Sequence, residues 1–140
     1  MYLTFTEYQN MGGKLDETTF NDYEFQARAQ IDWYTFNRLQ NEKEQCEAVK
    51  RCMYYLIKLI DLEAQALNVN GISDAGTTVA GAGIASQSND GVSISYNVLS
   101  AKDVVDMCGP EIKKTINSYL QGVMNELGQK VLYRGLYPNE

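Results

Sequence analysis

The chain has 140 residues, of which 44% are hydrophobic and 21% charged, and its formal net charge is −6. This length and composition predict one globular domain and exclude a disordered chain. The negative charge argues against electrostatic binding of nucleic acid, which needs a basic surface. No run approaches the ~20 apolar residues of a membrane span, so we expect no membrane partner.

The sequence contains no histidine and three cysteines, at positions 46, 52 and 108. Without histidine, Ser–His and Cys–His catalytic pairs and histidine-based metal sites are excluded. The cysteines form no CxxC motif, and we interpret them as small buried hydrophobic residues in a reducing compartment. The stretch GAGIAS at 81–86 resembles GxGxxG only superficially, since it does not open a helix after a strand. We therefore expect a chain that is not an enzyme and that uses no cofactor and no metal.

Two helices are predicted near the N-terminus. Thr4 and Glu7 have the spacing of a capping box, and the double glycine at 12–13 should end this first helix near residue 11. Asp16 is an N-cap candidate for a second, aromatic-rich helix of about five turns. The aromatic residues that we expect in its core are Trp33, Tyr34 and Phe36.

Residues 42–67 form the longest strongly periodic stretch, and they predict a central helix. Their apolar positions recur every three or four residues over a wide arc, which is typical of a helix packed on several sides. The polar link at 39–41 is short, so this helix and the preceding one should form an antiparallel helical hairpin. The other segments should pack on this central helix or extend from its ends.

A β-hairpin is predicted over residues 84–96, after a loop at 71–83 that is rich in Gly, Ala, Ser and Thr. Apolar and polar residues alternate on both sides of a turn at 88–91. An isolated two-stranded hairpin is marginally stable in water, so it should lie on the helices or on another chain. Its candidate interface residues are Ile84, Asn89, Asp90, Val92, Ile94 and Tyr96.

The C-terminal part predicts a further helix and an unusual tail. A capping pattern near Ser100 starts the helix, and Gly109 and Pro110 should interrupt and restart it, after which apolar periodicity continues to Leu127. Residues 129–140 are more apolar than a normal chain terminus. Their strand-prone, unpaired character suits pairing with a sheet edge of another chain. The candidate docking residues are Val131, Leu132, Tyr133, Arg134, Leu136 and Tyr137.

The elements together predict a mainly α fold. We expect a small antiparallel helical bundle around a long central helix, with one β-hairpin and an extended C-terminal tail. The domain would comprise residues 1–128, including the loop and hairpin at 71–96, and the tail would comprise residues 129–140.

Four blocks of sequence, in this order, resemble a known family. They are MYLTFTEYQNMGGKLDETTFNDYEFQARAQIDWYTFNRL at 1–39, EAVKRCMYYLIKLI at 47–60, SQSNDGVSISYNV at 86–98 and LYRGLYP at 132–138. The ordered set resembles the head–tail connector proteins, of the adaptor or head-completion type, from long-tailed double-stranded DNA phages and prophages of Gram-positive bacteria. The resemblance covers most of the chain and depends on the set, since no single block is a catalytic motif.

This resemblance implies a structural virion protein, made in the cytoplasm of the bacterial host. Its protomers would form a ring, usually of twelve copies, under the portal protein, and DNA would pass through the ring during packaging, retention and ejection without sequence-specific binding. The C-terminal segment, here residues 131–138, would dock on the portal. The hairpin would contact a ring neighbour or the next connector or tail-completion protein.

Two alternatives remain open. One is a stopper or tail-completion protein of the same connector stack, although such proteins are more often rich in β-structure. The other is a small DNA-binding regulator. The acidic net charge and the absence of a basic recognition helix argue against the regulator.

Overall fold

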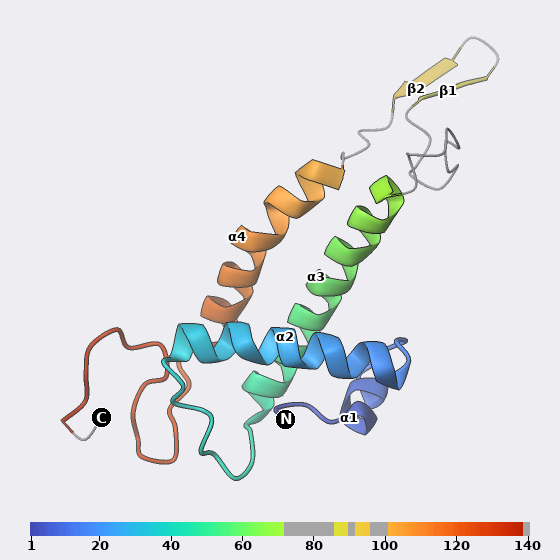
Figure 1. Cartoon of the computed structure of the whole chain (residues 1–140). Coiled ribbons are helices and arrows are strands. Elements are labelled where there is room, and N and C mark those ends of the chain that lie inside the picture. Colours follow the sequence, from blue (N-terminus) through green and yellow to red (C-terminus); the bar gives the residue numbers. More distant parts are fainter. Residues whose placement is uncertain (72–85, 90–91, 96–100, 139–140) are drawn as a thin grey trace.

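The computed structural model describes residues 1–71, 86–89, 92–95 and 101–138. Within these ranges the fold is mainly helical, which confirms the predicted class. The elements, in chain order, are α1 (Phe5–Asn10), α2 (Glu17–Thr35), α3 (Glu47–Gly71), β1 (Ser86–Asn89), β2 (Val92–Ser95) and α4 (Ala101–Leu120) (Figure 1).

The predicted N-caps of the two N-terminal helices are present, whereas Ser100 lies outside the described residues. Thr4 and Glu7 form a capping box at the start of α1, with the Thr4 backbone N–H donating to Glu7 Oε2 at 2.9 Å. Gly12 follows α1 with φ +93, a left-handed conformation that glycine adopts without strain. The Asp16 carboxylate accepts from the Thr19 backbone N–H at 3.0 Å and caps α2. Local sequence signals therefore set the start of each of these helices.

The central helix differs from its prediction at both ends, because it runs from Glu47 to Gly71 and not over 42–67. The preceding backbone is held outside a helix by side chains. Gln45 Nε2 donates to the Leu39 carbonyl oxygen at 2.9 Å, and the Glu42 carboxylate accepts from the Glu126 backbone N–H at 2.6 Å. These contacts fix residues 42–46 as part of a loop.

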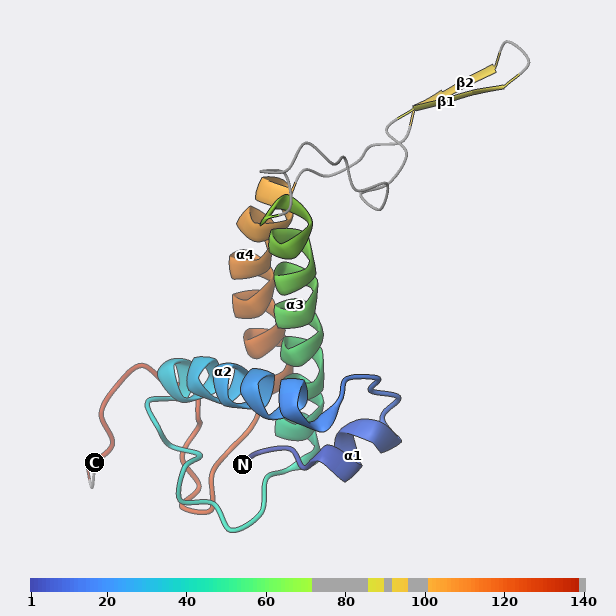
Figure 2. The ribbon, with the colours of Figure 1, turned by 45° about the vertical axis from the view of Figure 1, so that its right-hand side comes forward.

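Helices α3 and α4 lie side by side and antiparallel, whereas α2 crosses their lower part (Figures 1 and 2). The predicted antiparallel hairpin between α2 and α3 is therefore wrong, and the simple helical bundle is not found. Phe36 and Asn37, directly after α2, both have positive φ, at 53 and 60. Together with the nonhelical residues up to 46, this turn lets the chain enter α3 in a direction that crosses α2.

Helix α4 runs continuously through Pro110, so the predicted interruption is wrong. Proline costs a helix one backbone hydrogen bond, here to the carbonyl of Asp106. Pro110 and Asp106 are both exposed, so water can donate a hydrogen bond to the Asp106 carbonyl oxygen. The apolar face continues through the proline at four-residue spacing, and its packing on α3 maintains the helix. Helix α4 ends at Leu120 and does not reach Leu127.

The core lies where α2 crosses the α3–α4 pair. It draws on all four described helices, on the N-terminal segment and on the C-terminal segment. Its largest fully buried side chains include Phe20 and Ile31 of α2, Met53, Leu56 and Ile57 of α3, Ile116 and Leu120 of α4, and Leu3, Leu39 and Val131.

Strands β1 and β2 pair antiparallel, in a register that runs from Ser86 opposite Ser95 to Asn89 opposite Val92. Three residues of the predicted hairpin interface, Ile84, Asp90 and Tyr96, lie outside the described residues, as does most of the loop at 71–83. The interface role of this segment stays a prediction.

Candidate interaction surface

Helix α2 carries two apolar faces. The inner face, at spacings of three and four residues, is buried and comprises Phe20, Glu24, Ala27, Ile31 and Thr35. The outer face carries Phe25 and Trp33, which are 64% and 79% exposed, and Phe36, directly after the helix, is 53% exposed. The prediction that Trp33 and Phe36 belong to the core is wrong, while Tyr34 is partly buried against it. Position 33 lies about 200° around the helix from Ile31, and Phe36 has already left the helix.

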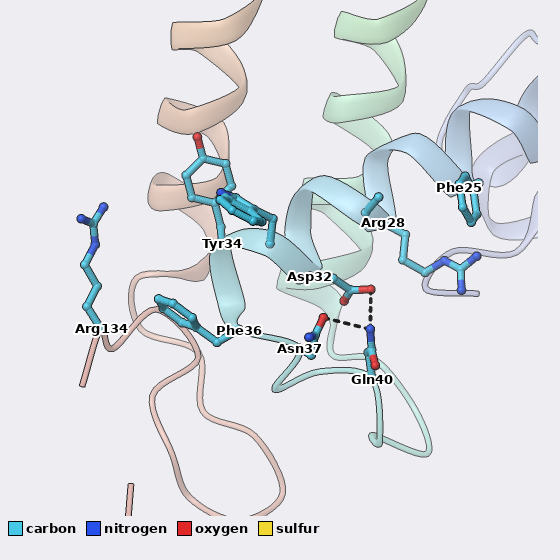
Figure 3. A pocket seen from close by; sticks show the side chains of 10 residues that line it. Phe25, Arg28, Asp32, Tyr34, Phe36, Asn37, Gln40 and Arg134 are labelled. Carbon is cyan, nitrogen blue, oxygen red and sulfur yellow. Dashed lines mark hydrogen bonds between the residues drawn. The ribbon is translucent and has the colours of Figure 1, made fainter. Parts of the chain in front are cut away.

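A groove of about 780 Å³ follows this outer face (Figure 3). Phe25, Ala29 and Trp33 lie one turn apart on α2, and the small Ala29 side chain leaves room between the two aromatic rings. Phe36 lines the end of the groove, and Arg134 reaches it from the C-terminal segment. The groove is therefore largely aromatic, with cationic groups at its margin.

A buried carboxylate on the inner face of α2 contacts Arg28, which lines the groove. Glu24 is only 2% exposed, and its Oε1 accepts from the backbone N–H of Tyr2 at 2.8 Å. Its Oε2 lies 3.5 Å from Arg28 Nε, and the Arg28 guanidinium lies 5.5 Å from the centre of the Phe25 ring. Glu24 thus positions a cation beside an exposed aromatic ring. The burial of Glu24 could be predicted from one feature of the sequence. Glu24 lies four residues after Phe20, which places it on the inner face of the helix.

Hydrogen bonds also fix the edge of the groove. Asp32 accepts from the hydroxyl of Tyr2 and from Gln40 Nε2, the latter at 3.1 Å, and Gln40 also donates to Asn37 Oδ1 at 3.0 Å (Figure 3). Burial, together with the bond to Asp32, raises the pKa of the Tyr2 hydroxyl. The phenol stays protonated and keeps donating. The turn after α2 is consequently tied to the helix, so the groove is preformed.

The predicted tail folds back on its own protomer in its first part. Val131 is fully buried in the core and Leu132 is partly buried. This corrects the expectation of an extended, separate segment that starts at residue 129. Tyr133, Arg134 and Leu136 are exposed, with Leu136 at 88%, whereas Tyr137 is half-buried. Their role in docking stays a prediction.

Arg38 holds this segment in place, and sequence reasoning missed it. Its Nη1 donates to the carbonyl oxygens of Lys130, Val131 and Tyr133, and its Nη2 donates to that of Gly135 at 2.8 Å. The guanidinium also lies 5.0 Å from the centre of the Tyr137 ring. No local pattern marks an arginine that binds main-chain atoms more than 90 positions away.

Comparisons of the chain with protein-family models, with curated proteins and with solved structures gave no match. None of the helices described here is both long enough and apolar enough to cross a bilayer. The function must therefore be argued from the exposed surfaces and from the resemblance of the four sequence blocks.

Proposed function

We propose that this chain is a structural protein of a phage head–tail connector, and that its copies form a ring, of twelve protomers, between the portal and the tail. The outer face of α2 is the observation that carries this proposal. Three large aromatic side chains share one exposed face beside Arg28, and an exposed apolar patch of this kind is typical of a protein–protein interface. The resemblance of the four sequence blocks is the reason for proposing a phage connector as the assembly.

The charge of the chain fits a ring that DNA passes through. A net charge of −6 on each copy repels the phosphate backbone, so DNA would pass through without sticking to the lumen. The assembled ring would then retain packaged DNA and release it on ejection through contacts with its neighbours in the stack.

The C-terminal segment supplies the portal contact in this proposal. Leu136 and Tyr133 present apolar side chains to solvent, while Arg38 holds the backbone beneath them. A segment that is already ordered loses less conformational entropy on binding than a free tail does. The hairpin at 84–96 would contact a ring neighbour or the next protein of the connector, and the helical pair would hold these two regions apart.

Co-sedimentation with purified rings of the portal protein from the same phage genome tests this proposal. Leu136→Ser should abolish co-sedimentation, whereas Leu67→Ser, an exposed leucine on α3, should leave it unchanged. The Leu136 side chain is 88% exposed, and the hydrogen bonds from Arg38 to Tyr133 and Gly135 go to backbone oxygens, so Leu136→Ser should fold normally. Equal binding by Leu136→Ser and wild type would refute docking through this segment. Portal particles without a ring of this protein would refute the connector assignment.

A further inference from the structure

A tight loop at residues 124–130 follows α4, and Asn125 closes it from inside. Asn125 Oδ1 accepts from the backbone N–H groups of Leu127 and Gln129, at 3.2 and 2.8 Å. Its Nδ2 donates to Gln129 Oε1 at 2.9 Å, and its own backbone N–H donates to the Gln129 carbonyl oxygen at 2.9 Å. Gly128 takes φ +74 at the turn, which a glycine allows without strain. The loop is therefore ordered before any partner binds.

This loop presents an apolar side chain to solvent. Leu127 is 80% exposed, and Met124 at the root of the loop is 56% exposed. Exposing a leucine on a rigid, hydrogen-bonded loop gives the fold no stability. It does lower the entropic cost of inserting that leucine into a partner. Loop 124–130 thus has the properties of a binding element.

The tip of the loop and the α2 groove carry side chains of opposite charge, whereas Lys130 at the other end of the loop is cationic. Glu126 lies next to Leu127, and its carboxylate accepts from the Lys43 backbone N–H at 3.4 Å. In the groove, the cationic groups are Arg28 and Arg134. The one carboxylate that lines it, Asp32, is engaged by Tyr2 and Gln40. An apolar loop tip with one acidic side chain, Glu126, and an aromatic groove with two arginines therefore lie on the same chain.

We propose that loop 124–130 of one copy docks in the α2 groove of a second copy. Leu127 enters between Phe25 and Trp33, above Ala29, and Glu126 faces Arg134. The groove is larger than one leucine side chain, so it accepts the tip of the loop. The contact joins two different surfaces of the chain, a head-to-tail arrangement that forms a ring when the rotation between copies closes. This inference rests on the proposed function, because it names the contact between neighbours in the ring.

Cysteine crosslinking between two variants, each with one exposed cysteine, tests the contact. Both variants carry Cys46→Ser, which removes the exposed native thiol, while Cys52 and Cys108 are buried. One variant carries Ala29→Cys and the other Leu127→Cys, so a crosslink between them joins two molecules. They are mixed, assembled on portal rings and oxidised. A disulfide-linked dimer is expected from this mixture. Met107→Cys, placed on a half-exposed residue of α4, replaces Leu127→Cys in the control, which should give no dimer above background.

Charge reversal sharpens this test. Glu126→Arg should weaken the Ala29→Cys to Leu127→Cys crosslink, and Arg134→Glu on the groove-bearing copy should restore it. Trp33→Ser should weaken self-association about thirtyfold, which is the loss typical of an interface hot spot. No more dimer than in the Met107→Cys control would overturn the inference, as would crosslinking of Ala29→Cys to the portal protein.

Portal co-sedimentation in the same samples separates this inference from the proposed function. Rings that bind portal without the Ala29–Leu127 crosslink would overturn the loop contact and leave the connector assignment standing. A crosslink that forms at high protein concentration without any portal binding would support the loop contact and count against the connector assignment.

Discussion

Arg38 binds the main chain of Gly135, 97 positions later, with Nη2 donating to the carbonyl oxygen at 2.8 Å. The same guanidinium bonds the carbonyl oxygens of Val131 and Tyr133, and the Arg38 side chain is almost fully buried. Arg38 therefore supplies hydrogen-bond donors to backbone carbonyl groups of an irregular segment, as a capping residue supplies partners to the unpaired backbone groups at a helix end. The C-terminal segment keeps one conformation because one arginine serves several of its carbonyl groups.

Replacing Arg38 by methionine keeps an unbranched stem but removes every donor. The free energy of unfolding should fall by about 2–4 kcal/mol, because charged hydrogen bonds are lost and partly buried carbonyls stay unsatisfied. Urea denaturation followed by circular dichroism measures this change. Arg51→Met is the matched control, since the Arg51–Glu47 pair is exposed and should contribute under about 1 kcal/mol. Equal losses of unfolding free energy in the two variants would contradict the role of Arg38 in holding the C-terminal segment.

The Glu7–Lys50 ion pair should make stability fall in acid. Lys50 Nζ lies 2.7 Å from Glu7 Oε1, and hydrogen bonds from Lys50 and Thr4 lower the pKa of Glu7 from 4.5 to about 2. A lowered pKa stabilises the folded state above pH 4.5, and this contribution is lost as the pH falls toward 2. A third of the Glu7 side chain is exposed, so we expect a contribution of about 1 kcal/mol.

Thermal unfolding of wild type and Glu7→Gln between pH 2 and pH 7 checks this sign. The melting temperatures of the two proteins should differ most above pH 4.5 and converge toward pH 2. Glu47→Gln provides the control, because its carboxylate pairs with Arg51 on the surface and does not bridge two helices. A difference between wild type and Glu7→Gln that stayed constant down to pH 2 would refute the ion-pair explanation.

The starts of α1 and α2 and the buried face of α3 were predictable because they depend on neighbouring residues. The Thr4 capping box, the Asp16 cap and the buried positions Val49, Met53 and Leu56 all follow from local spacing. The continuous course of α4 was not predictable in this way. Whether a helix continues through a proline depends on the packing of its other face against a distant partner, here α3.

The candidate site was only partly predictable. Hydrophobicity predicts Trp33 and Phe36 in the core, because it does not by itself tell an inner face from an outer one. The angle around the helix relative to Ile31 would have separated Trp33 from the core. Arg38 and Asn125 act on backbone groups, which leave no side-chain pattern in the sequence.

Substitutions on the two faces of α2 should have different effects on the isolated protomer. Trp33→Ser should change the free energy of unfolding by no more than about 0.5 kcal/mol, because the side chain is mostly exposed. Phe20→Ala should cost about 3–5 kcal/mol, because Phe20 is fully buried and packs on Phe5 and Tyr8. Urea titrations at low protein concentration measure both values. A large loss for Trp33→Ser would mean that the outer face packs within the protomer.

The three thiols should react in a fixed order with iodoacetamide. Cys46 is exposed and should be alkylated in the folded protein at pH 8. Burial raises the pKa of Cys52 to about 12, and burial followed by the nearby Glu63 carboxylate raises that of Cys108. Since the thiolate is the reactive form, both should stay unmodified until the helices open. Intact-mass spectrometry should show one adduct in buffer and three in urea.

The order in which the two buried thiols are alkylated shows which part of the fold unfolds first. Cys108 lies in the first half of α4, with its Sγ 3.8 Å from the Leu59 carbonyl oxygen, and it is outside the main core cluster, whereas Cys52 belongs to that cluster. Regions with fewer buried contacts open at lower free energy. In mild urea Cys108 should therefore be alkylated before Cys52, as peptide mass spectrometry over time can measure. Equal rates would show instead that the α3–α4 pair and the α2 crossing unfold as a single cooperative unit.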